Sequence, residues 1–244
     1  MVLTIDIGNS RIKLSVFQQH TLIYFEAFSP EVALKKMKNI FNKFPNCSKT
    51  VLSSVGKLDI EVFNFLKSKS EVELITHETP FPFKNLYATP KTLGIDRMVL
   101  AAGAAIQFPK KNKLVIDAGS CITYDLITAQ NEYLGGAISP GFNLRYASLH
   151  QFTANLPLLN RVETANFIGN STENAIQSGV INGISFEIDG FISHYTKDFE
   201  DLTIILTGGD ADFLAKRLKN TIFANSNFLL ESLNLLSLYI NEND

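Results

Sequence analysis

Alternating apolar and polar positions predict a strand near the start of the chain. The side chains of Ile12, Leu14 and Val16 are apolar, and each follows a polar residue, a period of two that is typical of a half-buried strand. An apolar run at residues 3–5 precedes this segment and ends in Asp6, one further residue and a glycine. We therefore expect a strand, a tight glycine-containing turn and a second strand.

Apolar residues at helical spacing predict three longer helices. One should start at Ser29–Glu31, where a proline follows a capping hydroxyl and an acid occupies the first turn. Residues 93–108 predict a second, more buried helix, and residues 171–194 predict a long one. In the long helix, Gly179 and Gly183 should allow another backbone to approach closely.

Strands continue to alternate with helices towards the C-terminal end. A short apolar run at residues 202–206 predicts a strand, which leads into Thr207–Asp210 and a helix capped by Asp210. Mixed strands and helices throughout the chain indicate the α/β class.

One sequence pattern occurs twice. Residues 3–10 and 114–120 are both short apolar runs that end in Asp, one residue, Gly and small polar residues. The copies begin the two halves of the chain, too far apart for a solenoid repeat of about 20–50 residues. We therefore expect two duplicated domains, residues 1–110 and 111–244, that meet at the polar break Pro109–Lys113.

Composition and charge exclude several classes of protein. A formal charge of −2 over 244 residues gives no electrostatic reason to expect nucleic acid or an anionic membrane as a partner. Cys47 and Cys121 lie far apart without a CxxC pair, so neither a zinc site nor a disulfide framework is predicted, and a reduced cytoplasmic compartment is expected. The first residues lack a signal-peptide pattern, and the longest apolar stretch, Met98–Ile106, is too short to span a bilayer.

Three turns carry residues suited to binding phosphate. They are Asp6–Ser10, Asp117–Ser120 and Thr207–Asp210, and each places glycine beside short polar side chains at the end of a predicted strand. Lys13 would project its charge towards the phosphates, while the first two aspartates supply carboxylates for magnesium or another cation. The same pattern also forms simple β-turns, so a single turn leaves both interpretations open. The chain contains neither GxxxxGK[ST] nor GxGxxG, so a P-loop or Rossmann nucleotide site is not expected.

Taken in order, the motifs of the chain resemble those of the type III pantothenate kinases, members of the superfamily of acetate and sugar kinases, heat-shock chaperones and actin. The motifs DxGN[TS]xxK, YxxPxxLGxDR, DxG[TS]xxTxD, GGxIxPG and TGGD occur in the family's order at Asp6–Lys13, Tyr87–Arg97, Asp117–Asp125, Gly135–Gly141 and Thr207–Asp210. They span nearly the whole chain, so the resemblance is specific. It implies an α/β fold of two duplicated actin-like (ribonuclease H-like) domains with a nucleotide cleft between them.

The resemblance also implies an activity, the ATP-dependent phosphorylation of pantothenate to 4'-phosphopantothenate, the first step of coenzyme A biosynthesis. Asp96 would be the general base on the pantothenate hydroxyl, and Asp117 would hold the potassium or ammonium ion that the family requires beside Mg²⁺. The family forms homodimers, and the long helix that begins near Thr172 is the expected interface element. The residues implied to bind ATP are Asp6, Ile7, Gly8, Asn9, Ser10, Arg11, Ile12, Lys13 and Ser120. Those implied to bind pantothenate are Tyr87, Gly94, Ile95, Asp96, Arg97 and Thr172.

The chemistry of Asp96 and Arg97 is compatible with this activity. Asp96 falls in the first turn of a predicted helix, where the helix dipole favours its ionised form, although the spacing alone is also explained by a helix-start acid beside a solvated arginine. The chain departs from the family pattern at Ser10 and Ser120, where threonine is usual, and at Cys121, where alanine is usual. Serine retains the hydroxyl group, so the expected contacts to phosphate and cation are preserved.

Two other functions stay open from the sequence. One is a sugar kinase of the same superfamily, although the compact chain has no inserted sugar-binding segments. The other is a non-catalytic regulatory homologue that binds nucleotide or pantothenate without turnover. Retention of Asp6, Lys13, Asp96, Arg97 and Asp117 argues against lost catalysis, so we predict a pantothenate kinase.

Overall fold

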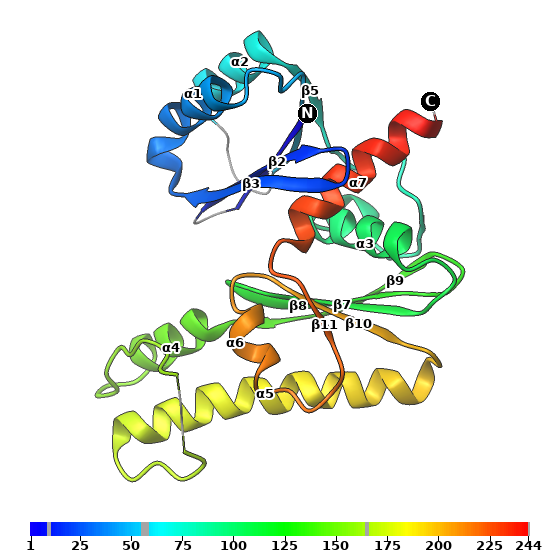
Figure 1. Cartoon of the computed structure of the whole chain (residues 1–244). Helices are drawn as coiled ribbons and strands as arrows, with labels where there is room; N and C mark the ends of the chain where they lie inside the picture. The colour runs from blue at the N-terminus through cyan, green and yellow to red at the C-terminus, as the bar shows by residue number, and fades with distance from the viewer. Residues whose placement is uncertain (9–10, 55–58, 164–165, 244) are drawn as a thin grey trace. The chain divides into compact units, whose positions relative to one another are not determined.

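The chain folds into two compact units, each built on one β-sheet (Figure 1). The first unit comprises residues 1–109 and 227–244, and the second comprises residues 110–226. Strands and helices occur in both units, so the predicted α/β class is confirmed. The computed structural model describes residues 1–8, 11–54, 59–163 and 166–243. In these ranges no helix is both long and apolar enough to cross a membrane.

The sheet of the first unit has five strands in the order β3-β2-β1-β4-β5. Strand β1 pairs antiparallel with β2, and β2 antiparallel with β3. On its other side β1 pairs parallel with β4, and β4 pairs parallel with β5. The strands are β1 (Val2–Ile7), β2 (Ile12–Gln18), β3 (Thr21–Phe28), β4 (Lys49–Ser54) and β5 (Glu71–Leu74).

Helices cover both faces of this sheet (Figure 1). On one face, Leu3, Ile5 and Ile7 of β1 join apolar side chains of α1 and α2 in a single core. On the other face lie α3 and α7, and α7 contacts β1, β2 and β4. Because of this second layer, β2 buries Ser15 and Phe17 as well, and the prediction of a half-buried strand is wrong. The helices are α1 (Ala33–Lys43), α2 (Ile60–Lys69), α3 (Ile95–Gln107) and α7 (Phe228–Asn243). A 3-10 turn at Pro30–Val32 precedes α1. The short strand β6 (Lys84–Asn85) and a second 3-10 turn at Pro90–Thr92 precede α3.

The second unit repeats the arrangement of the first. Five strands of its six-stranded sheet lie in the order β9-β8-β7-β10-β11, which matches β3-β2-β1-β4-β5 position by position. Antiparallel pairs join β7 to β8 and β8 to β9, and parallel pairs join β7 to β10 and β10 to β11. The equal order and directions confirm the duplication that the sequence repeat predicts. The strands are β7 (Lys113–Ala118), β8 (Cys121–Ile127), β9 (Glu132–Pro140), β10 (Thr203–Thr207) and β11 (Phe223–Ala224).

The apolar core of the second unit lies between its sheet and three helices. Leu114 and Ile116 of β7 meet Ile184 of the long helix α5 in this core. No part of the described chain makes the predicted close approach at Gly179 and Gly183 of α5, since a Cβ added at either glycine meets none of its atoms within 4 Å. That side of the helix faces open space rather than the sheet. The helices are α4 (Phe142–Gln151), α5 (Thr172–Asp198) and α6 (Ala211–Ala215).

The last helix packs with the first unit, whereas the division predicted from the sequence keeps residues 111–244 together. Helix α7 contacts α3 and three strands of the first sheet, and it buries Leu230, Leu233 and Leu236. The sequence repeat marks where each half begins, but the apolar side chains of α7 decide which sheet the end of the chain covers.

Small residues make the contact between α3 and α7 close. Residues 101–105 of α3 read Ala-Ala-Gly-Ala-Ala and are all buried. A Cβ on Gly103 would overlap the side chain of Ser232 on α7 and would lie 3.0 Å from its Cα. The Ser232 hydroxyl donates a 2.6 Å hydrogen bond to the carbonyl of Phe228 in its own helix. The two helices can therefore meet at this distance only if position 103 has no side chain.

Alanine at Gly103 should lower the free energy of unfolding by about 1–3 kcal/mol, because the added methyl group overpacks this contact. The matched control is alanine at Gly190 of α5, where an added Cβ meets no atom of the described chain within 4 Å. Gly190→Ala should raise the free energy of unfolding by about 0.5–1 kcal/mol through helix propensity alone. Chemical denaturation measures both changes, and equal effects of the two substitutions would contradict the packing argument.

Candidate functional site

Asp6 lies near the carboxyl end of β1, the middle strand of the first sheet. The strand register pairs it with Lys13 on β2 and with Ser53 on β4. The Ser53 hydroxyl donates a 2.9 Å hydrogen bond to Oδ1 of Asp6. The turn beyond β1 contains a 3.1 Å hydrogen bond from the Gly8 N–H to the carbonyl of Arg11. The first predicted phosphate turn is therefore tight and follows a buried carboxylate.

The other residues implied to bind ATP in this segment divide between core and turn. Ile7 and Ile12 are buried in the apolar core of the first unit, so only their backbone groups are available to a ligand. Arg11 is exposed. Asn9 and Ser10 lie outside the described residues.

Burial changes the acidity of Asp6. It raises the pKa of this carboxyl group to about 6, against the opposing effects of the Ser53 hydrogen bond and the Lys13 charge. The negative charge of Asp96 raises the pKa further. The carboxyl groups of Asp6 and Asp96 therefore interact electrostatically.

Five residues implied to bind pantothenate lie together around the start of α3. Gly94 is the N-cap residue, Ile95 is buried, and Asp96 falls in the first turn. Oδ1 of Asp96 accepts a 2.9 Å hydrogen bond from the Arg97 backbone N–H and occupies the space that a Cβ on Gly94 would fill. The Arg97 side chain is buried, and its guanidinium carbon lies 5.7 Å from the centre of the Tyr87 ring. An acid, a guanidinium group and an aromatic ring thus share one region of the first unit.

Asp117 occupies the position in the second unit that Asp6 occupies in the first. Its register partners are Thr123 on β8 and Thr207 on β10, so Thr123 stands at the position that Lys13 has in the first unit. Both threonine hydroxyls are buried, and neither has a hydrogen-bond partner among the described residues. A carboxylate flanked by two such hydroxyls suits a cation that prefers oxygen ligands. Across the described part of the chain, three or more His, Cys, Asp or Glu side chains nowhere form a group that could hold a metal ion.

The third predicted turn packs directly against the second. Gly208 has a φ of 95°, and a Cβ there would overlap the Asp117 carboxylate and the carbonyl of Ala118. Only glycine adopts this conformation without strain while leaving room for the aspartate. The Asp210 N–H donates a 3.0 Å hydrogen bond to the carbonyl of Ala118 and so joins the two turns.

Ser120 is exposed in the turn between β7 and β8. Its carbonyl accepts a 3.0 Å hydrogen bond from the Gly141 N–H, and a Cβ on Gly141 would overlap the carbonyl of Gly119. The GGxIxPG motif therefore ends in a glycine that packs behind the turn implied to bind ATP.

Thr172 lines a groove between α4 and α5 in the second unit. It is the first residue of α5 and follows Ser171, whose hydroxyl caps the helix by accepting a 3.2 Å hydrogen bond from the Asn174 N–H. The groove has a volume of about 650 Å³, and apolar side chains of both helices form its walls. Arg145 of α4 supplies its one basic side chain among the lining residues that the structure describes.

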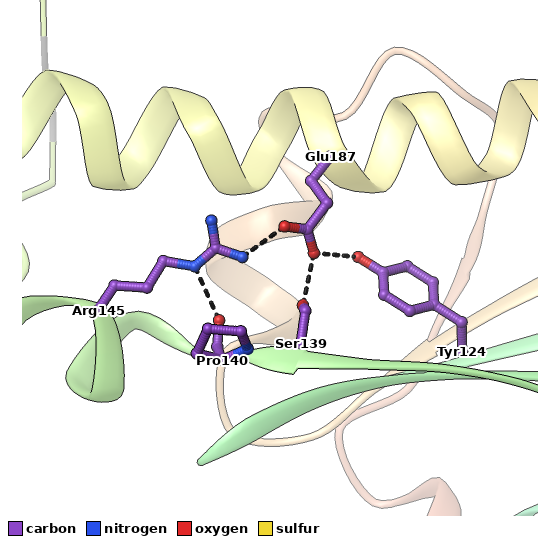
Figure 2. Close-up of polar contacts among 5 residues, drawn as sticks. All are labelled: Tyr124, Ser139, Pro140, Arg145 and Glu187. Carbon is purple, nitrogen blue, oxygen red and sulfur yellow. Dashed lines mark hydrogen bonds and ion pairs between the residues drawn. The ribbon is translucent and has the colours of Figure 1, made fainter. Parts of the chain in front are cut away.

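Figure 2 shows the polar network that holds Arg145 beside this groove. Glu187 of α5 accepts hydrogen bonds from the Tyr124 hydroxyl (2.9 Å) and the Ser139 hydroxyl (2.5 Å). It also pairs with Nη2 of Arg145 at 2.5 Å, while Nε of the arginine donates to the carbonyl of Pro140 at 2.8 Å. Burial alone would raise the pKa of Glu187, but the three donors together lower it. The network ties α5 to α4, β8 and β9. No local sequence pattern predicts it, because the donors lie 42–63 residues from Glu187 along the chain.

Solved structures confirm the fold class. A protein from Campylobacter jejuni, described as a Baf family transcriptional activator, matches with a TM-score of 0.64 at 23% identity, over 99% of this chain and 100% of that chain. A glucokinase from an Antarctic psychrotroph matches with a TM-score of 0.52 at 12% identity, over 98% of both chains. At these identities the likeness concerns the fold alone. With the duplicated sheets and the glycine-bearing turns, it makes the chain a protein of the actin-like class to which the sugar kinases belong.

Sequence comparison identifies the family within this class. The family model described as type III pantothenate kinase matches residues 2–194. A type III pantothenate kinase of Flavobacterium johnsoniae is 57% identical over 244 residues and 100% of both chains, and one of Phocaeicola vulgatus is 39% identical over 241 residues and 98% of both. The chain belongs to the type III pantothenate kinase family, as its motifs predict.

Asp6→Asn should make the protein more stable above pH 6. The pKa of Asp6 rises from 3.8 to about 6 on folding, so between these values the folded chain binds more protons than the unfolded chain and stability falls as pH rises. Asparagine removes this penalty, which amounts to about 3 kcal/mol above pH 6, and can still accept the hydrogen bond from Ser53. Denaturation curves at pH 4 and pH 7.5 measure the difference. A variant that gains no stability at pH 7.5 relative to pH 4 would contradict the raised pKa.

Proposed function

We propose that the chain catalyses the ATP-dependent phosphorylation of pantothenate to 4'-phosphopantothenate, the first step of coenzyme A biosynthesis. The observation that carries this proposal is family membership: the type III pantothenate kinase model matches residues 2–194, and a relative with that name is 57% identical over the full chain. The activity makes the chain a phosphotransferase with an alcohol group as acceptor.

Asp96 is the general base in the proposed reaction. The oxygen of the pantothenate hydroxyl forms a bond to the γ-phosphorus of ATP, the bond from that phosphorus to the bridging oxygen breaks, and ADP leaves. The hydroxyl proton passes to the Asp96 carboxylate. The place of Asp96 in the first turn of α3 supports this role, because it puts the carboxylate beside Gly94 and the buried Arg97 at one helix start. A base of this kind contributes about 10²–10⁴ to the rate.

Residues around Asp96 are proposed to bind pantothenate. Arg97 offers a planar guanidinium group that matches the carboxylate of the substrate, and Tyr87 packs against that group. Gly94 and Ile95 contribute backbone at the same helix start. Thr172 contributes a hydroxyl from the groove of the second unit.

The segment Asp6–Lys13 and Ser120 are proposed to bind the phosphates of ATP together with Mg²⁺. Asp6 and Lys13 are register partners, so a carboxylate suited to Mg²⁺ and an ammonium group suited to phosphate project from the same face of the sheet. Phosphoryl transfer depends mainly on such positioning and neutralisation of charge.

Asp117, Thr123 and Thr207 are proposed to hold the potassium or ammonium ion. The hydroxyls of the two register partners of Asp117, which have no hydrogen-bond partner among the described residues, support this assignment. When bound, the ion adds positive charge close to the phosphates. In the duplicated fold, Thr123 stands beside Asp117 at the position that Lys13 has beside Asp6.

The enzyme is proposed to act in the cytoplasm as a homodimer, with α5 at the interface. Phe167, Ile168 and Phe186 are 74%, 85% and 57% exposed on α5 and the segment before it. The rings of Phe167 and Phe186 stack with centroids 6.1 Å apart. Exposed apolar side chains that gather in one place are typical of protein–protein contacts, which supports this choice of surface.

A regulatory homologue and a sugar kinase of the same superfamily are the weaker alternatives. The likeness to the Baf family protein and to the glucokinase extends to the fold alone, whereas the relatives at 57% and 39% identity are named as pantothenate kinases. Assay of the purified chain with ATP, Mg²⁺ and potassium separates the three functions. Phosphorylation of pantothenate supports the proposal, turnover of a sugar supports the second alternative, and binding without turnover supports the first.

Asp96→Asn should lower kcat at least about 100-fold, because it removes the base and leaves the shape of the side chain. Gly94→Ala should cause a smaller loss, since the added methyl group displaces the Asp96 carboxylate without removing it. Steady-state kinetics measure both effects, and calorimetry should show that both variants still bind ATP and pantothenate. Near-normal turnover by Asp96→Asn would refute the assignment of the base.

Valine at Thr123 or at Thr207 should raise the potassium concentration for half-maximal activity about tenfold, because each substitution removes one oxygen beside Asp117 and keeps the side-chain volume. Ser15→Ala is the control. Its hydroxyl is also buried without a partner among the described residues, but its register partners are Thr4 and Phe25 rather than a carboxylate. Potassium titrations of activity compare the three variants. If a threonine variant responds to potassium as Ser15→Ala does, the hydroxyl of that threonine does not hold the ion.

A further inference from the structure

Arg161 lies between two aromatic rings and a carboxylate in the second unit. Its Nη1 forms an ion pair with Oδ1 of Asp210. Its guanidinium carbon is 5.0 Å from the ring centre of Phe142 and 4.0 Å from that of Phe213, and the two rings meet edge to face at 5.4 Å. A planar cation that is stacked and paired in this way has one preferred position.

Asp210 connects Arg161 to the turns of the candidate site. Although Asp210 stands at the N-cap of α6, its carboxylate makes no capping hydrogen bond in the described structure, so the predicted cap is wrong. The carboxylate binds Arg161 instead, while the backbone N–H binds the carbonyl of Ala118 at 3.0 Å. Two residues earlier, Gly208 packs against the Asp117 carboxylate. A single turn therefore contacts Arg161 at one end and Asp117 at the other.

Other hydrogen bonds anchor the segment that carries Arg161. The carbonyl of Asn160 accepts a 2.8 Å hydrogen bond from Nε2 of Gln177, and the carbonyl of Glu163 accepts one from Arg217. These anchors lie on both sides of Arg161 in sequence. Loss of the ion pair would therefore release the Asp210 carboxylate and leave the segment attached.

A released Asp210 would disturb the site electrostatically. Burial raises the pKa of this carboxyl group, and the charge and hydrogen bond of Arg161 lower it. Without Arg161, the turn that packs against Asp117 would carry a partly buried carboxylate, with no cation paired to it in the described structure. Unpaired buried charge is costly, and negative charge repels phosphate, so the turn would shift or the nucleotide would bind less well.

We propose that Arg161 is a positioning residue for the nucleotide site: its ion pair with Asp210 holds the turn at residues 207–210 against Asp117 and thereby sets the affinity for ATP. The inference rests on the proposed function in so far as ATP is the ligand of these turns. It does not depend on pantothenate as the phosphoryl acceptor.

Calorimetric titration of the full chain with ATP, in the presence of Mg²⁺ and potassium, tests the proposal. Arg161→Met should raise the Kd for ATP about tenfold, as is typical when the partner of a ligand-holding group is lost, and should leave the Kd for pantothenate unchanged. Arg161→Lys keeps the charge and should recover part of the affinity. Lys43→Met is the control, because Lys43 also lies over an aromatic ring, 4.1 Å from the centre of the Tyr24 ring, but belongs to the first unit. It should bind ATP like the unchanged chain.

A second variant distinguishes the loss of the ion pair from a simple loss of folding. Asp210→Asn preserves the size of the side chain and should also weaken ATP binding, and adding it to Arg161→Met should cause little further loss, because both substitutions remove one interaction. Unchanged ATP affinity in Arg161→Met or in Asp210→Asn would overturn the inference, as would equal weakening in Lys43→Met. If the unchanged chain binds ATP without phosphorylating pantothenate, and Arg161→Met still weakens ATP, the proposed function fails and the inference stands. If the unchanged chain binds no ATP, both fail.

Discussion

Strand register beside one aspartate in each sheet is the constraint on which the candidate site depends. Hydrogen bonding of β1 to β2 and β4 places Asp6 between Lys13 and Ser53, and the equivalent pairing in the second unit places Asp117 between two threonines. A slip of one residue would turn every one of these side chains to the opposite face. The duplicated fold therefore supplies two acids in equivalent places. Asp6 stands beside the basic side chain of Lys13, whereas Asp117 stands beside threonines whose hydroxyls suit a bound ion.

Close contacts at two glycines keep the carboxylates of Asp117 and Asp96 in place. Gly208 lets a turn lie against Asp117, and Gly94 leaves room for the Asp96 carboxylate to fold back over the start of α3. In each case a methyl group would occupy space that an acidic oxygen fills. The buried position of Asp6 lowers stability at neutral pH, because the carboxyl group must ionise with little water around it. Such a cost is typical of functional sites, where geometry rather than stability determines the residue.

Hydrogen bonds and ion pairs between residues distant in sequence hold other parts of the candidate site in place. Glu187 binds donors from three other elements and so fixes α5, which begins at Thr172, against the second sheet. Arg161 does the same for the turn that ends at Asp210. Neither residue belongs to a motif that resembles the family pattern. Their partners lie so far away in sequence that only the folded chain brings the charges together.

By itself the sequence determined the α/β class, the duplication, helices α3 and α5, and the order of motifs that identifies the family, because strand period, helix spacing and glycine-bearing turns are properties of local sequence. It also placed Asp6, Asp96 and Asp117 at element ends. Only the tertiary structure decided that α7 covers the first sheet and that Gly103 rather than Gly179 makes a close contact within the chain. It also decided that the two threonines beside Asp117 in the sheet have no hydrogen-bond partner for their hydroxyls among the described residues. These features arise from register and from side chains distant in sequence, and no local pattern encodes which surfaces will meet.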